Sequence, residues 1–203
     1  MRRRLSSWRL FWAMALLISL VNCLSLATAD FHTEKGTVPA ILLAVRCALP
    51  FFLVAFTASS AARLWPSRAT GWILANRRYF GLAFAFGMAW HLSFVAYSLS
   101  VFGNHLGRLV TTLDLTGLAF LLALTLTSFQ WAKRRMSPTA WRRLHKTGVY
   151  VIWLLATYIY YEFAKGDRDL FDFTALGVML AAWLLRFIAW SRRQMVTMSS
   201  SSS

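Results

Sequence analysis

Long apolar segments, separated by short polar stretches, divide the chain into six candidate membrane spans. The apolar runs cover residues 10–29, 37–62, 79–102, 109–129, 138–163 and 170–190. Each is close to or above the roughly 20 residues that a helix needs to cross the hydrocarbon core of a bilayer. Ser137 followed by Pro138 marks the start of the fifth helix, because Ser is a favoured N-cap and Pro a favoured first helical residue. The pattern predicts an all-α integral membrane protein, a bundle of six transmembrane helices.

The stretches between the runs are predicted as loops. Residues 63–78 form a basic loop whose middle, residues 72–75, lies flat at the membrane interface, where Trp is favoured. Gly103-Asn104 ends the third span, and residues 130–143 form the most basic stretch. Residues 162–172 are acidic and predict an outer loop.

The charges orient the spans. Sixteen of the 22 Lys and Arg residues fall on the side of the N-terminus, four fall on the other side, and Arg46 and Arg186 lie within spans. All seven acidic residues fall on the outer side or at outer helix ends. Because basic residues are enriched in cytoplasmic loops, both termini are predicted to be cytoplasmic. Arg46, one turn before Pro50, is interpreted as snorkelling to the outer interface.

Three parts are expected along the chain. Residues 1–36 hold the first span and an outer loop, in which His32 is expected to be solvated, and residues 37–193 form the main transmembrane domain. Residues 194–203 are rich in Ser and predict a disordered tail. The run at 10–29 ends in Ala27-Thr28-Ala29-Asp30, which also fits a signal-peptide cleavage site. An uncleaved signal-anchor span is favoured because the apolar run is long for a signal core.

Composition narrows the class of protein. Hydrophobic residues make up 58% of the 203 residues, aromatic residues 16%, and the mean hydropathy is +0.53. The net charge of +15 does not indicate a nucleic-acid partner, because the cations lie in short runs between apolar segments. No length remains for a flavin or nicotinamide domain, and no GxGxxG loop is present. Cys23 and Cys47 are interpreted as buried free thiols, with a disulfide between them left open.

Two histidines carry the candidate chemistry. His91 lies near the middle of the third span and His145 in the first turns of the fifth, and both spans run from inside to outside. An ionisable side chain within a membrane indicates a functional site, and buried imidazole commonly ligates metal. A haem held edge-on between two helices takes one histidine from each. We therefore expect His91 and His145 to be axial ligands of haem iron.

Other residues fit around such a haem. Aromatic side chains at Phe84, Phe86, Trp90 and Phe94 are expected to line its ring. Its propionates are expected to face the basic residues at the inner end of the spans, which are Arg77, Arg78, Arg142, Arg143 and Lys146.

A second haem is a further candidate. His105 lies fourteen residues after His91, on roughly the same helical face and about 21 Å higher. The matching position on the fifth span, thirteen residues after His145, is Tyr158, and tyrosinate can ligate ferric haem. The alternative is that His105 is a hydrogen-bonded loop histidine. Asp114, near the outer end of the fourth span, is expected to pair with Arg108.

Three motifs resemble the ferric-reductase-like transmembrane family, which includes NADPH oxidases. They are Arg77-Arg78-Tyr-Phe-Gly-Leu followed by Trp90-His91, then Leu124-Thr-Leu-Thr-Ser128, then Trp141-Arg-Arg-Leu-His145-Lys. Within that family the chain is most similar to the haem-binding membrane subunit of the bacterial periplasmic methionine sulfoxide reductase system (MsrQ-like). The resemblance covers about residues 40–190. It implies six helices and b-type haem bound through His91 and His145. Family members commonly carry a histidine where this chain has Tyr158, and that departure puts the second haem in doubt.

These observations predict a haem b membrane subunit that passes electrons outward across a bacterial inner membrane. The expected donor is a separate flavin reductase or quinol, and the resemblance implies a periplasmic oxidoreductase as acceptor. No catalytic acid, base or nucleophile stands out in the sequence. Two alternatives remain. One is a non-redox protein, a small transporter or assembly partner, with structural histidines. The other is a haem-free relic of the fold.

Overall fold

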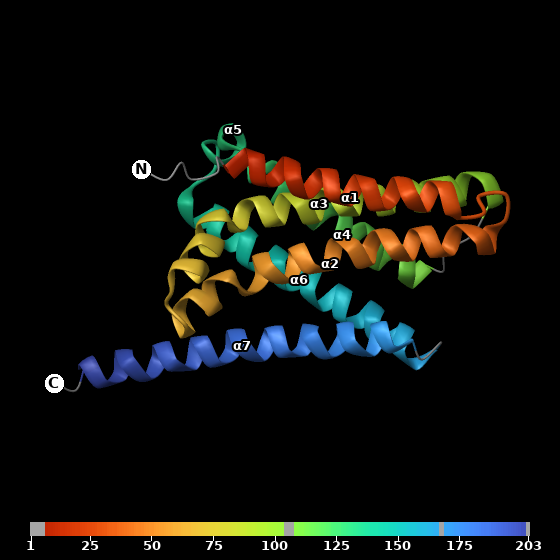
Figure 1. The fold of residues 1–203 in the computed structure, drawn as a ribbon. Helices are drawn as coiled ribbons and strands as arrows, with labels where there is room; N and C mark the ends of the chain where they lie inside the picture. Colours follow the sequence, from red (N-terminus) through yellow and green to blue (C-terminus); the bar gives the residue numbers. More distant parts are fainter. Residues whose placement is uncertain (1–6, 104–107, 167–168, 202–203) are drawn as a thin grey trace. The chain divides into compact units, whose positions relative to one another are not determined.

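The computed structural model describes residues 7–103, 108–166 and 169–201, and all regular secondary structure within them is helical (Figure 1). The prediction of an all-α protein is confirmed. Side chains are described within these ranges except at residues 7, 108–111 and 196–201. The helices are α1 (Ser7–Thr28), α2 (Glu34–Leu64), α3 (Arg68–Phe102), α4 (Arg108–Leu126), α5 (Gln130–Lys133), α6 (Pro138–Lys165) and α7 (Leu170–Ser201).

Four of the described helices are long and apolar enough to cross a membrane. They span Trp8–Thr28, Glu34–Leu64, Arg68–Phe102 and Leu170–Met195. The apolar part of α4, Thr112–Leu126, is shorter, and α6 carries Arg142, Arg143 and Lys146 in its first turns. Six spans and cytoplasmic termini therefore stay predictions. One face of α1 carries four large apolar side chains that are 64–72% exposed (Trp12, Leu16, Leu20 and Leu24), as expected of a helix facing lipid.

The chain divides into two compact units. The first unit runs to Phe52 and resumes from Asn76 to Thr116, and the second holds Leu53–Ala75 and the chain from Gly117 onward. In the first unit, Met14 and Ile18 of α1 pack with Ala83 of α3. Ala40 and Ala44 of α2 pack with Phe94 of α3. In the second unit, α6 packs along α7 (Figure 1).

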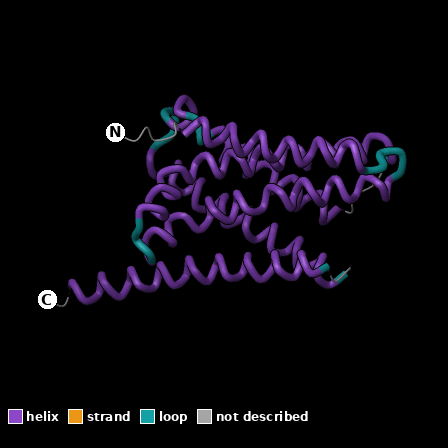
Figure 2. Tube along the Cα trace, viewed as in Figure 1, coloured by secondary structure: helices purple, strands orange, loops and turns teal. Residues whose placement is uncertain are grey.

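Short connections join the helices, as the loops in Figure 2 show. The prediction of a basic loop over residues 63–78 is wrong, because α2 continues to Leu64 and α3 begins at Arg68. Ser67 and Thr70 explain the early start of α3. The Ser67 hydroxyl accepts from the Thr70 N–H at 3.2 Å, and the Thr70 hydroxyl accepts from the Ser67 N–H at 3.0 Å. This reciprocal pairing is a capping box, so residues 72–75 are helical, and their position at the membrane interface stays a prediction.

The start of α6 and the end of α3 agree with the predictions from the sequence. Ser137 caps α6 by accepting from the Ala140 N–H at 3.1 Å, with Pro138 in the first turn, so this predicted helix start is confirmed. Gly103 takes a φ of +66° directly after α3, as the predicted break requires. The acidic loop is shorter than expected because α6 extends to Lys165. Helix α7 continues to Ser201, into the serine run that the sequence predicts to be disordered, because no Gly or Pro interrupts it after Gly177.

Candidate functional site

His91 is held against α2 by a single backbone contact in the first unit. Its Nδ1 lies 3.1 Å from the carbonyl oxygen of Ile41. A carbonyl can only accept, so Nδ1 carries the ring proton and Nε2 keeps its lone pair. Histidines that ligate metals usually donate their other ring N–H to a carbonyl or carboxylate in this way. Nε2 of His91 therefore has the protonation state that a metal ligand needs.

Small residues bring the backbones of α2 and α3 close together beside His91. Ala40, Ala44 and Ala48 recur every four residues on α2, and all three are fully buried. Gly87 lies one turn before His91 on α3, and a Cβ placed there would be 2.8 Å from the Cβ of Ala48. This arrangement is the small-xxx-small packing typical of membrane helices. It places the Ile41 carbonyl within reach of the imidazole.

The face of α3 that carries His91 is buried along its length. Phe94 is 4% exposed and contacts Phe31, with the ring centroids 5.8 Å apart. One turn further, the Ser98 hydroxyl lies 3.4 Å from that of Thr37. Asp114 of α4 belongs to the same unit as His91. The side chain of Arg108, its expected partner, lies outside the described residues.

The aromatic residues predicted to line a haem pack largely against other rings of the first unit. Phe84 contacts Phe52, with centroids 5.1 Å apart, and Trp90 contacts Phe94 at 5.7 Å. Phe86 contacts Phe11 of α1 at 6.3 Å. A role for these side chains around a haem stays a prediction.

His145 lies in a second, separate cluster, in the second unit. Its Nε2 lies 3.0 Å from the hydroxyl of Thr127, and that hydroxyl donates to the carbonyl of Ala123 at 2.6 Å. With its proton used there, the hydroxyl accepts from Nε2–H, so His145 is protonated on Nε2. The ring also packs on Trp141, with centroids 4.3 Å apart. Trp141 Nε1 in turn donates to the Thr127 carbonyl at 3.0 Å.

The other predicted site residues are placed as follows. Tyr158 of α6 is 42% exposed, and Arg77 is exposed on α3. The Arg78 guanidinium lies 5.7 Å from the Trp8 ring and 5.6 Å from the Tyr79 ring, as a cation beside aromatic faces. His105 lies outside the described residues. His91 and His145 belong to different units, and their pairing across one haem stays a prediction.

The interpretation of Cys23 and Cys47 as free thiols is confirmed, but their predicted burial is wrong, because Cys23 is exposed and Cys47 is half-buried. His32 is exposed in the connection before α2, as expected. Among the described residues no three His, Cys, Asp or Glu side chains gather into a compact metal site.

Arg186 of α7 makes a set of contacts that the sequence did not indicate. Its Nη1 donates to the carbonyl of Phe56, and its Nε donates to the Tyr150 hydroxyl at 3.2 Å. The guanidinium also lies over both rings, 4.3 Å from the Phe56 centroid and 4.7 Å from that of Tyr150. These contacts join α7 to the end of α2 and to α6 within the second unit. An arginine inside an apolar run was the available signal, but its partners lie 36 and 130 residues away.

Comparisons with protein-family models, curated proteins and solved structures found no match to this chain.

Proposed function

We propose that this chain is a haem b-binding transmembrane electron-transfer subunit of the ferric-reductase-like type, similar to the membrane subunit of the periplasmic methionine sulfoxide reductase system. The observation that supports it most is the contact between His91 Nδ1 and the Ile41 carbonyl. That contact leaves Nε2 of an imidazole on an apolar helix in the form that binds iron. The chain has six spans with both termini cytoplasmic, in a bacterial inner membrane.

His91 and His145 are the proposed axial ligands. In His91 the contact with Ile41 uses Nδ1, which leaves Nε2 for iron. Ligation through Nε2 of His145 requires that iron replace the Thr127 hydroxyl and that the ring proton move from Nε2 to Nδ1. The haem supplies the redox chemistry, and the protein contributes ligation and burial. Arg77 and Arg78 are the proposed partners of the propionates.

The electron donor is a separate flavin reductase or quinol, and the acceptor is a periplasmic oxidoreductase. A second haem, if present, uses His105 and Tyr158. The exposed phenol of Tyr158 is open to a ligand on that side of α6.

A non-redox membrane protein is the second candidate, and the Thr127 contact favours it. Both histidines already have hydrogen-bond partners within the chain, at Ile41 and at Thr127. Buried polar side chains paired in this way also stabilise contacts between membrane helices. In this case neither imidazole binds iron.

Optical spectra of the purified protein distinguish the two functions. The full chain is expressed with added haem, and spectra are recorded for the oxidised and dithionite-reduced forms of the wild type, His91→Ala and His145→Ala. We expect a sharp low-spin b-type α band in the wild type and its loss in both variants. His32→Ala is the matched control, because it removes an exposed imidazole outside the spans and should keep the band.

A pyridine haemochrome count on the same samples, with His105→Ala added, gives the number of haems. A folded wild-type protein without a Soret band would overturn the proposal and favour the non-redox candidate. A band that persists in His145→Ala would remove that residue from the ligand set.

A further inference from the structure

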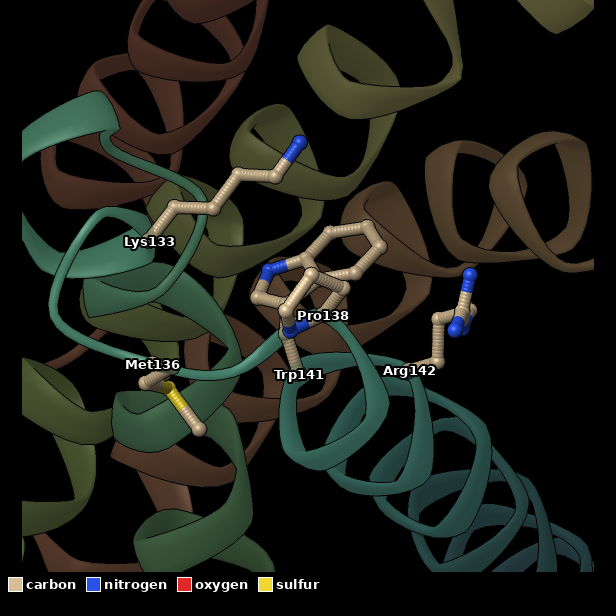
Figure 3. Close-up of a pocket in the computed structure, with 5 residues that line it drawn as sticks. All are labelled: Lys133, Met136, Pro138, Trp141 and Arg142. Carbon is tan, nitrogen blue, oxygen red and sulfur yellow. The ribbon is translucent and has the colours of Figure 1, made fainter.

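A cavity of about 200 Å³ opens in the second unit where the turn after α5 meets the first turns of α6. It is lined by Lys133, Met136, Pro138, Trp141 and Arg142. Trp141 lies at its centre with Lys133 on one side and Arg142 on the other (Figure 3). The Lys133 ammonium lies 4.6 Å from the centroid of the Trp141 ring. The cavity therefore combines two cations with an apolar wall.

The surrounding sequence favours an anionic ligand. No Asp or Glu occurs between Gly117 and Tyr161, whereas six Lys and Arg residues lie in that segment (Lys133, Arg134, Arg135, Arg142, Arg143 and Lys146). In this segment no carboxylate competes with an external anion for the cations. Lys supplies a compact charge, and Arg supplies a planar fork that matches phosphate oxygens.

The apolar wall indicates that the anion is attached to a lipid. Met136, Pro138 and the indole of Trp141 offer a free phosphate nothing to bind, whereas the glycerol and first methylenes of a phospholipid pack on such side chains. Trp131 is 57% exposed nearby on α5, and the Arg135 guanidinium lies 5.5 Å from its ring centroid. Exposed Trp beside cations at the ends of apolar helices is typical of the headgroup level of a membrane.

We propose that this cavity binds the phosphodiester headgroup of an anionic membrane phospholipid, with Lys133 and Arg142 contacting the phosphate and Trp141 packing on the glycerol. The proposal does not depend on haem. Because Trp141 also packs on His145 and donates to Thr127, the bound lipid lies one side chain away from His145.

Native mass spectrometry of the full chain, released from mixed micelles, tests the proposal. The probes are phosphatidylglycerol and phosphatidylcholine. We expect phosphatidylglycerol to be retained preferentially by the wild type. In Lys133→Gln/Arg142→Gln its apparent affinity should fall by about tenfold or more, since each cation at a membrane surface contributes appreciably to binding an anionic lipid.

Arg134→Gln/Arg143→Gln is the matched control, because it removes the same charge from the same segment outside the cavity lining. It should retain most of the affinity. Far-UV circular dichroism and size exclusion verify that both double variants are folded. Equal losses in the two double variants, or equal retention of both lipids, would overturn the proposal. Displacement of the lipid by excess soluble glycerol phosphate would assign the cavity to free phosphate instead.

Discussion

His91 and His145 differ in the ring nitrogen that makes a hydrogen bond within the protein. His91 uses Nδ1 on a backbone carbonyl, and His145 uses Nε2 on a hydroxyl. Residue type and the apolar context single out both positions in the sequence, and their role as ligands stays a prediction. The occupied nitrogen could not be predicted, because it depends on residues 50 and 18 positions away in the chain.

Asp30, in the connection between α1 and α2, anchors the first turn of α2. Its carboxylate accepts from the His32 backbone N–H at 2.9 Å and from the Thr33 hydroxyl at 2.9 Å. Thr33 in turn accepts from the Gly36 N–H at 3.1 Å, as a helix N-cap. The His32 N–H first, and then the Thr33 hydroxyl, hold the pKa of Asp30 below its ordinary value of 3.8.

A carboxylate with a lowered pKa stabilises the folded state above its ordinary pKa and loses that effect as the pH falls through the lowered value. We therefore expect Asp30→Asn to melt below the wild type at neutral pH, with the difference shrinking once the pH falls below 3.8. Thermal unfolding in detergent over a pH series measures this. Glu34→Gln is the control, because it leaves both hydrogen bonds of Asp30 intact. Its difference in melting temperature from the wild type should not shrink below pH 3.8 in the way expected for Asp30→Asn. A difference between Asp30→Asn and wild type that is independent of pH would contradict the prediction.

At the scale of elements, α2 and α3 pack closely because the residues between them have small side chains or none. Ala40, Ala44 and Ala48 face a part of α3 where Gly87 stands one turn before His91. The Ala spacing is visible in the sequence as a small-xxx-small pattern, but the sequence does not indicate which helix packs against it.

Gly87→Ala should destabilise the protein by about 1–3 kcal/mol, because the added methyl meets both the Cβ of Ala48 and, at 3.2 Å, its Cα. Gly81→Ala on the same helix is the matched control, since nothing lies within 4 Å of a Cβ there. It should be neutral or stabilising by up to about 1 kcal/mol, because Ala favours the helix over Gly. Denaturant titrations in detergent followed by circular dichroism compare the two. Equal effects would show that the close approach at Gly87 is not needed for stability.

Helix boundaries were predictable where a single residue dictates them. Ser137-Pro138 located the start of α6, and Gly103 located the end of α3. The early start of α3 was missed because the cap uses Thr70 where Glu or Gln is usual. The basic residues around the cap also favoured the prediction of a loop. The lengths of α6 and α7 were underestimated for a related reason, since charged residues end an apolar run without ending a helix.

At the scale of the whole molecule, the distribution of charge predicts how the chain lies in a membrane. The cations gather at one end of the proposed spans and the acids at the other. The apolar runs sufficed to predict a helical membrane protein. Composition alone does not predict the number of spans, because the charges on α6 lower its hydropathy.

Thiol labelling of intact cells tests the orientation. In a background of Cys23→Ser/Cys47→Ser, we expect His32→Cys to react with a membrane-impermeant maleimide. Gln194→Cys should react only after the membrane is permeabilised, because both termini are proposed to be cytoplasmic. Both positions are exposed in the structure, so access to the thiol does not depend on unfolding. Labelling of Gln194→Cys in intact cells would contradict the six-span topology.

The contacts of Arg186 are made with residues that are synthesised earlier than Arg186 itself. An arginine near the middle of a lone helix costs about 2.5–3.5 kcal/mol to insert into a bilayer. Here Phe56 and Tyr150 supply a carbonyl, a hydroxyl and two aromatic faces for that charge. Both residues leave the ribosome before α7 does, so the last helix enters the membrane when its partners already exist. Synthesis from the N-terminus thus makes the groups that contact Arg186 before Arg186 itself.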